Sequence, residues 1–197
     1  MVTQWDSALF KPYRVAFPPA HNTSPEAYSA HVHDLVSRDV KASHLKSLQG
    51  YLWAKGYESG EIRCPLFPDV APAFDAWYKA GIPIIIYSSG SVAAQKLLFQ
   101  YTDSELGDMR GMISGYFDTV NAGMKREKSS YKKIAASRKE DIGKWLFLSD
   151  QVQEVEAAKD AGMQSLIVVR EGNTPLSDGD KRHALIQGFD EINIQGV

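Results

Sequence analysis

The spacing of apolar residues first becomes regular at Ser24. From there Tyr28, Val32 and Leu35 recur at the intervals that place them on one face of a helix. Ser24 is a residue type that caps helices, and Pro25 suits a first helical position because that position needs no backbone N–H. The pattern therefore predicts a helix that begins at Pro25.

A second amphipathic segment runs from about 44 to 54. Gly56, Gly60 and Pro65 then interrupt the helical pattern. Together the two segments predict a small helical lobe over residues 25–64.

The first 24 residues carry mixed signals. Tyr13, Val15 and Phe17 alternate with other residues as in a short strand, which Pro18 and Pro19 would end. We treat residues 1–24 as an atypical N-terminal segment.

After residue 64 apolar runs alternate with helical patterns up to residue 197. The runs PIIIY, WLFLS and SLIVV at 83–87, 145–149 and 165–169 predict strands buried on both faces, and GYFDTV at 115–120 predicts a shorter strand. Helices are predicted over 70–80, 91–101, 130–138 and 151–161. This alternation predicts an α/β fold, with a Rossmann-like parallel sheet covered by helices on both faces.

Composition narrows the range of partners. The 197 residues are 44% hydrophobic and 23% charged, with a formal net charge of -2, which gives no electrostatic reason to expect nucleic acid or an anionic membrane. No apolar run approaches the ~20 residues that span a bilayer, and the start lacks a secretory signal pattern. The single cysteine, Cys64, excludes an internal disulfide and fits a reducing compartment. We expect a cytoplasmic protein.

Hydroxyl groups follow the first of the long apolar runs. Ligands of parallel sheets bind at the carboxyl ends of the strands, and Ser88, Ser89, Gly90 and Ser91 stand at such an end. Serine hydroxyls donate hydrogen bonds to phosphate oxygens, and a glycine lets backbone N–H groups turn towards an anion. A simple turn with Ser91 as the helix cap is the alternative, and it leaves Ser88 unexplained.

A carboxylate follows the second run. Asp150 could be only a helix cap, or it could be a ligand of Mg²⁺, which prefers carboxylate oxygens, with Glu154 supporting it one helical turn later. The lysine-rich stretch NAGMKREKSSYKK lies between the two strand ends. Most of its lysines are expected on a solvated face, but one pointing inwards would neutralise a phosphate. The pattern alone does not choose which one.

Several of these stretches together resemble the enolase-phosphatases of methionine salvage, a branch of the haloacid-dehalogenase-like hydrolases. They are YSSGSVAAQKLLF, GYFDT, MKREKSSY, FLSDQVQEVEAAKDAGM and VVREGN. The similarity spans roughly Ala27 to the C-terminal end, and LQGYLWAKGYESGEI followed by FPDV resembles the family's cap region. The resemblance implies a haloacid-dehalogenase-like core over residues 65–197 and a helical cap lobe over 25–64.

The resemblance also implies an activity. The family enolises and dephosphorylates 2,3-diketo-5-methylthiopentyl-1-phosphate with Mg²⁺, which yields an acireductone. By matching position, Ser88 and Ser89 would bind the phosphoryl group, Lys125 would hold the phosphate and the nucleophile, and Asp150 would be a metal ligand. The expected partner is thus a small phosphorylated substrate, and we expect a monomer in the cytoplasm, with the nucleus as a further location.

One motif of the family has no match. The family carries Asp-x-Glu-Gly-Thr at the end of a first strand that precedes the cap, and this aspartate is the nucleophile. Residues 13–18 have strand character but no carboxylate. The other acidic candidates lack a leading apolar strand or stand in helical or loop contexts; they are Asp6, Asp34, Asp39, Asp69 and Asp75.

The missing strand has a structural consequence. In the family it lies centrally, between the strand that ends at Ser88 and the strand that ends at Asp150. Its absence, or its replacement by another segment, predicts a slot with unpaired backbone groups between those two strands.

Three explanations compete for this departure. The chain could be a truncated or mis-started enzyme whose true N-terminus is replaced by unrelated residues, or a shortened, inactive isoform that binds phosphorylated metabolites or a partner. Alternatively, residues 13–18 could fill the slot without restoring the chemistry. We combine the first and third explanations and expect little or no turnover. A dinucleotide-binding dehydrogenase is disfavoured, because no G-x-G-x-x-G follows any strand.

Overall fold

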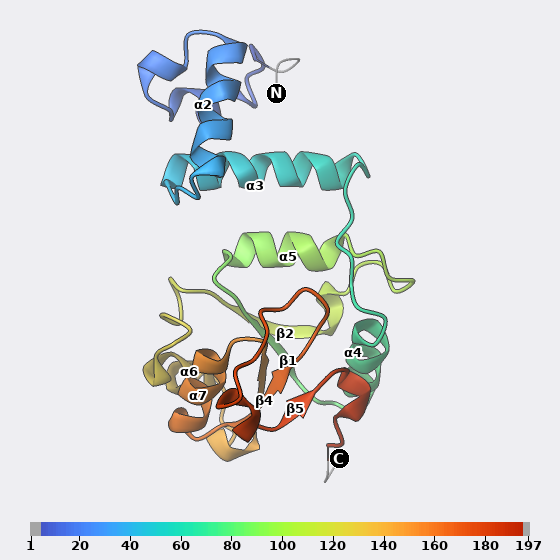
Figure 1. Cartoon of the computed structure of the whole chain (residues 1–197). Coiled ribbons are helices and arrows are strands. Elements are labelled where there is room, and N and C mark those ends of the chain that lie inside the picture. The colour runs from blue at the N-terminus through green and yellow to red at the C-terminus, as the bar shows by residue number, and fades with distance from the viewer. Residues whose placement is uncertain (1–4, 195–197) are drawn as a thin grey trace. The chain divides into compact units, whose positions relative to one another are not determined.

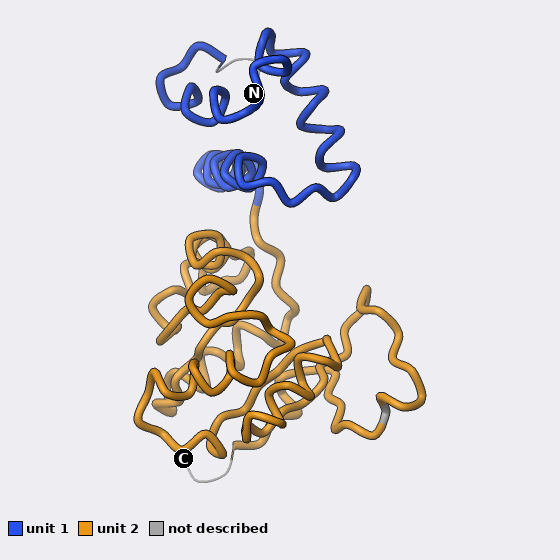
Figure 2. The backbone as a smooth tube through the Cα atoms, turned by 90° about the vertical axis from the view of Figure 1, so that its left-hand side faces the viewer, with its two compact units in different colours: residues 1–62 blue, residues 63–197 orange. Residues whose placement is uncertain are grey.

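The computed structural model describes residues 5–194, except for the side chain of Lys181. Residues 1–62 and 63–197 form two compact units, coloured separately in Figure 2. Across the part of the chain that is described, no helix is both long and apolar enough to cross a membrane.

Unit 1 is helical. Its helices are α1 (Lys11–Val15), α2 (Pro25–Ser37) and α3 (Ser43–Glu58), with a 3-10 turn at Pro19–His21. The predicted helix N-cap at Ser24 is confirmed, because the Ser24 hydroxyl accepts a hydrogen bond from the N–H of Ala27. Pro25 is the first residue of α2, as predicted. The second predicted helical segment is α3, which continues past Gly56 and ends at Glu58.

The predicted strand at Tyr13–Phe17 is wrong. The chain there forms α1 and the turn after it, and the Tyr13 ring stacks on Tyr51 of α3 with 4.5 Å between ring centroids. Phe17 is buried against Tyr28 of α2, 4.7 Å between centroids. Tyr13 and Phe17 are four residues apart, a spacing that also suits one face of a helix, and Pro12 suits a first helical turn. The hypothesis that residues 13–18 fill the slot in the sheet is therefore also wrong.

Unit 2 alternates helices and strands as predicted (Figure 1). In chain order its main elements are α4 (Val70–Lys79), β1 (Ile84–Tyr87), α5 (Val92–Gln100), β2 (Ile113–Phe117), α6 (Lys128–Ala136), β3 (Leu146–Ser149), α7 (Val152–Ala161), β4 (Gln164–Val168) and β5 (Leu185–Ile186). The α/β class is thus confirmed. The two-residue strand β5 is an addition that the apolar pattern did not predict.

The strands form two parallel sheets instead of one. β1 pairs with β2, while β4 pairs with β3 on one side and β5 on the other. Within residues 5–194, β1 and β3 each have a strand neighbour on one edge only. This division of the sheet agrees with a missing central strand.

Helices cover both faces of β1. Ile84 and Ile86 pack in a cluster with Phe74 of α4, whereas Tyr87 points to the other face and meets the ring of Tyr131 on α6. The Tyr131 ring also contacts Phe147 of β3, with 4.9 Å between centroids. Tyr131 of α6 therefore contacts both the end of β1 and the strand β3.

The prediction that the apolar strands are buried on both faces holds only in part. Within β1 only Ile84 is buried, and in β3 only Ser149 is, while Leu146 is 37% exposed. A strand covered on both faces but paired along one edge leaves its other edge accessible. The open edges of β1 and β3 account for this exposure.

Candidate active site

The residues after β1 form a tight loop before α5. The N–H of Ser88 donates to the carbonyl of Phe117 at 3.1 Å, and its Oγ accepts from the N–H of Gly90 at 3.1 Å. Ser91 caps α5 through its Oγ, as the turn interpretation required. Ser89 is exposed and Ser88 is half-buried. Since Ser88 Oγ acts as an acceptor in this turn, its own proton remains to be donated to a phosphate oxygen.

Three hydroxyl groups hold the backbone around Lys125. Each donates to one of three consecutive carbonyls: Tyr87 to Gly123 at 2.6 Å, Ser130 to Met124 at 2.8 Å and Tyr131 to Lys125 at 2.5 Å. Two of the donors lie on α6 and one ends β1. The segment that carries Lys125 is therefore tied to the end of β1 as well as to the helix that follows it.

The ammonium group of Lys125 points towards the end of β3. Its Nζ lies 2.6 Å from Oε2 of Glu154, which also accepts the Ser149 hydroxyl at 2.7 Å. The side chains of Lys125 and Glu154 are 22% and 10% exposed. The same Nζ lies 5.9 Å from the ring centroid of Tyr87. This mostly buried pair is thus electrostatically stronger than an ion pair at the surface.

Asp150 follows directly on β3 and does not cap α7. The helix starts at Val152 with Gln151 in the cap position, and it has no side-chain cap bond. Asp150 is exposed, and its Oδ2 accepts from the side-chain amides of Gln151 at 3.1 Å and Asn173 at 3.3 Å. The helix-cap interpretation of Asp150 is therefore wrong, which leaves its carboxylate available to a ligand.

A chain of contacts links the ends of β1 and β3. It passes from Tyr87 to Lys125, then to Glu154 and Ser149. Ser88 follows the first of these residues and Asp150 follows the last. Ser88 and Asp150 thus flank the place where β1 and β3 end, and Lys125 lies between these two strand ends.

Asp118 is a buried carboxylate at the end of β2 that the sequence reasoning left without a role. It accepts hydrogen bonds from the backbone N–H groups of Asn121, Val92 and Val120, and these bonds hold the pKa of Asp118 below its usual value. A carboxylate that accepts three backbone N–H groups braces the loop, since these bonds occupy three of its about four acceptor sites. Its place directly after a strand was the signal that could have identified it.

The acidic residues rejected as nucleophiles are engaged elsewhere. Each forms an ion pair with a basic side chain: Asp6 with Arg14, Asp34 with Arg38, Asp39 with Lys41, Asp69 with Arg170 and Asp75 with Lys79. Among these, only Asp69 and Asp75 belong to unit 2. The carboxylate that meets Lys125 is Glu154, and it is already paired.

Other reactive side chains have different surroundings. His21 and His31 stack on each other in unit 1, and burial lowers the pKa of His31. Burial also raises the pKa of the Cys64 thiol, which disfavours the thiolate form.

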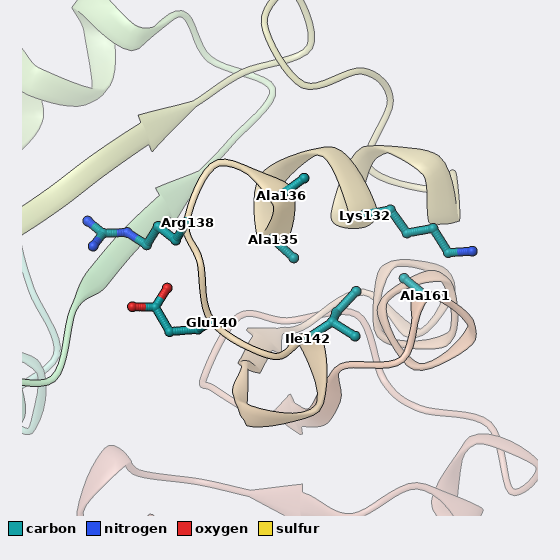
Figure 3. A pocket seen from close by; sticks show the side chains of 7 residues that line it. All are labelled: Lys132, Ala135, Ala136, Arg138, Glu140, Ile142 and Ala161. Carbon is teal, nitrogen blue, oxygen red and sulfur yellow. The ribbon is translucent and has the colours of Figure 1, made fainter.

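Two surface hollows do not coincide with the candidate site. The first, of about 480 Å³, is shown in Figure 3. Ile142 precedes β3 and Ala161 ends α7, so this hollow lies at the start of the strand. The second, of about 660 Å³, lies beside β2 near Lys96 and Tyr116. The strand ends that carry Ser88 and Asp150 are therefore not part of either hollow.

Comparison with solved structures defines the class of the fold. A HAD hydrolase, family IA, variant 3, from Entamoeba histolytica superposes with a TM-score of 0.56 at 16% identity, covering 97% of this chain and 91% of that one. The yeast protein UTR4 from Saccharomyces cerevisiae superposes with a TM-score of 0.75 at 33% identity, covering 98% of this chain and 94% of its own. The fold is that of the haloacid-dehalogenase-like (HAD) hydrolases. None of the family models matches the sequence.

Sequence relatives define the family within that class. Enolase-phosphatase E1 of Pyricularia oryzae is 59% identical over 192 residues, and that of Sclerotinia sclerotiorum is 55% identical over 204 residues. Each match covers 96% of this chain, and 83% and 80% of the respective relative. The chain belongs to the enolase-phosphatase E1 family, which is a family of phosphatases.

These matches also extend the expected range of similarity. Because these matches cover 96% of the chain, they extend N-terminal to Ala27 and include part of the first 24 residues. Most of the first 24 residues therefore lie within the matched region, and the truncation of the chain stays a prediction.

The donor set fits Mg²⁺ in kind but falls short in number. Asp150 offers the hard carboxylate oxygen that Mg²⁺ prefers, and it is exposed. Glu154 is occupied by Lys125 and Ser149. Over residues 5–194 no three side chains of His, Cys, Asp or Glu are grouped to hold a metal ion. Asp150 could thus be one ligand of a magnesium ion that takes its other ligands from water, substrate phosphate or a further carboxylate.

Proposed function

We propose that this chain is a magnesium-dependent enolase-phosphatase acting on 2,3-diketo-5-methylthiopentyl-1-phosphate in methionine salvage. The observation that carries the proposal is the position of Lys125 between the ends of β1 and β3, within a chain 55–59% identical to enolase-phosphatases. A lysine at two converging strand ends supplies the positive charge that a phosphate monoester requires.

Each candidate residue has a task in this scheme. Ser88 and Ser89 donate hydrogen bonds to the phosphoryl oxygens from the loop before α5. Lys125 neutralises phosphate charge, and Asp150 provides a magnesium ligand. Magnesium bound there would supply further positive charge against the phosphoryl oxygens. Residues 25–64 are proposed to act as the cap, and the working protein is proposed to be a cytoplasmic monomer.

We further propose that the 197 residues alone turn over little or no substrate. Phosphoryl transfer through an aspartyl enzyme needs a carboxylate in line with the leaving oxygen. Glu154 is engaged with Lys125, and Asp118 is engaged with three N–H groups. The unpaired edges of β1 and β3 mark where a strand carrying that carboxylate would add to the sheet.

The pairing of Glu154 with Lys125 and of Asp118 with backbone N–H groups favours a second candidate function. A chain with a phosphate-binding loop and a lysine but no available nucleophile could bind phosphorylated metabolites without hydrolysing them. Binding without release of inorganic phosphate is the result that this second function predicts.

A completed chain tests the substrate assignment. The completed chain is the 197 residues joined at the N-terminus to an apolar strand that ends in Asp-x-Glu-Gly-Thr. With Mg²⁺ its kcat/KM for the diketo phosphate should exceed that for glucose 6-phosphate by roughly 10²-fold, because the proposal makes the diketo phosphate the specific substrate and glucose 6-phosphate an unrelated phosphate ester. Released phosphate and the absorbance of the acireductone are the two readouts. Equal hydrolysis of both esters, or phosphate release with no acireductone, would contradict the assignment.

A further inference from the structure

The side-chain amide of Gln95 ties the Ser88–Ser91 loop to the end of β2. Its Nε2 donates to the carbonyl of Gly90 at 2.8 Å and to that of Phe117 at 2.8 Å. The side chain is buried, with 5% exposed. Because both neighbours are carbonyl oxygens, only the NH₂ group of the amide can face them, which fixes the orientation of the amide.

Two more hydrogen bonds join the same segments. The carbonyl of Phe117 also accepts the N–H of Ser88, and the carboxylate of Asp118 accepts the N–H of Val92 at 3.0 Å. The loop is therefore fixed at its first residue, at Gly90 and at the start of α5. Ser89 is exposed between these fixed points.

The bond to Gly90 also orients a backbone donor. In a trans peptide unit the C=O and the following N–H point in opposite directions, and every described peptide bond of this chain is trans. With the Gly90 carbonyl directed at Gln95, the N–H of Ser91 is directed away from it. The amide of Gln95 thus helps to set which way the polar groups of the loop face.

Packing alone would not require an amide at this position. The Oε1 atom of Gln95 is buried, and within the described residues it has no hydrogen-bond partner. An unpaired buried acceptor destabilises a fold, and a methionine of similar length would avoid that cost. The amide is therefore explained by its two bonds to the loop and to β2.

We propose that Gln95 is a positioning residue for phosphate binding, acting through Ser88, Ser89 and the backbone of their loop. This inference rests on the proposed phosphate site. Gln95 itself does not touch the phosphate; it holds the loop in the conformation that meets it.

The test is the Kd of the 197-residue chain for inorganic phosphate, followed by NMR titration. Gln95→Met keeps the length of the side chain and removes two hydrogen bonds, so it should raise the Kd by roughly tenfold. Ser165→Ala is the matched control, because it also removes a buried side-chain bond to a carbonyl, that of Phe147 at 3.1 Å on β3. It should leave the Kd unchanged.

A double variant separates positioning from general stability. Because Gln95 acts through Ser88, Ser89 and the loop backbone together, Gln95→Met combined with Ser89→Ala should raise the Kd by less than the product of the two single effects. Fully multiplied effects, or an unchanged Kd in Gln95→Met beside a raised Kd in Ser89→Ala, would overturn the role of Gln95 and leave the phosphate site standing. If the unaltered chain does not bind phosphate, or if Ser89→Ala and Lys125→Met leave its Kd unchanged, the phosphate site itself fails and the inference fails with it.

Discussion

The completed chain should hydrolyse the diketo phosphate on the order of 10⁶-fold faster than the same chain with asparagine in place of its strand-end aspartate. The magnitude is that of removing the nucleophile from a protease in which the reacting residues act as a unit. The reason is that the aspartate would be the nucleophile at the end of the added strand, whereas Glu154 is already paired with Lys125. The measurement is kcat for phosphate release by both forms with Mg²⁺.

The asparagine form is also the control for folding. An added strand should pair with β1 and β3 in either form, because pairing uses backbone groups. Both forms should therefore unfold at the same urea concentration, and both should be more stable than the 197-residue chain. Equal turnover by the two forms would contradict a nucleophilic role for the strand-end carboxylate.

Replacing Lys125 should have the largest effect on stability of any single change at the site. Lys125→Met removes the cation from Glu154, which is 10% exposed and then has the Ser149 hydroxyl as its remaining partner. Breaking a buried pair from one side costs about 3 kcal/mol of unfolding free energy. Urea unfolding of the 197-residue chain measures this loss.

A double-mutant cycle identifies the cause of that loss. Glu154→Gln keeps an acceptor for Ser149 and removes the charge, so adding it to Lys125→Met should recover part of the stability. Lys128→Met is the control, because Lys128 is an exposed lysine of the same basic stretch and should change stability by about 0.5 kcal/mol or less. Strictly additive effects of the changes at 125 and 154 would show that the two groups do not stabilise each other.

The strand ends could be predicted from the sequence because they depend on local patterns. Apolar runs that stop at Ser88 and at Asp150 mark the carboxyl ends of β1 and β3 with little dependence on the rest of the chain. The family resemblance also predicts an open position between these two strands, and the division of the sheet agrees with it.

Other features depend on contacts between distant residues and could not be predicted in this way. The partners of Asp118 and Gln95 are backbone groups up to 26 residues away, at Val92 and Phe117. Helix α1 was taken for a strand because the spacing of its apolar residues suits both structures, and packing against α3 decided between them. The strand β5 has only two residues, too few for a periodic pattern.

The most direct test of the central claim is a turnover assay of the unaltered 197-residue chain on the diketo phosphate with Mg²⁺. We predict that phosphate release stays at the rate measured without protein, while inorganic phosphate still binds to the chain. Turnover at ordinary enzyme rates, ~1–10³ s⁻¹, would contradict the account, because it would require a nucleophile among residues to which we assign other partners.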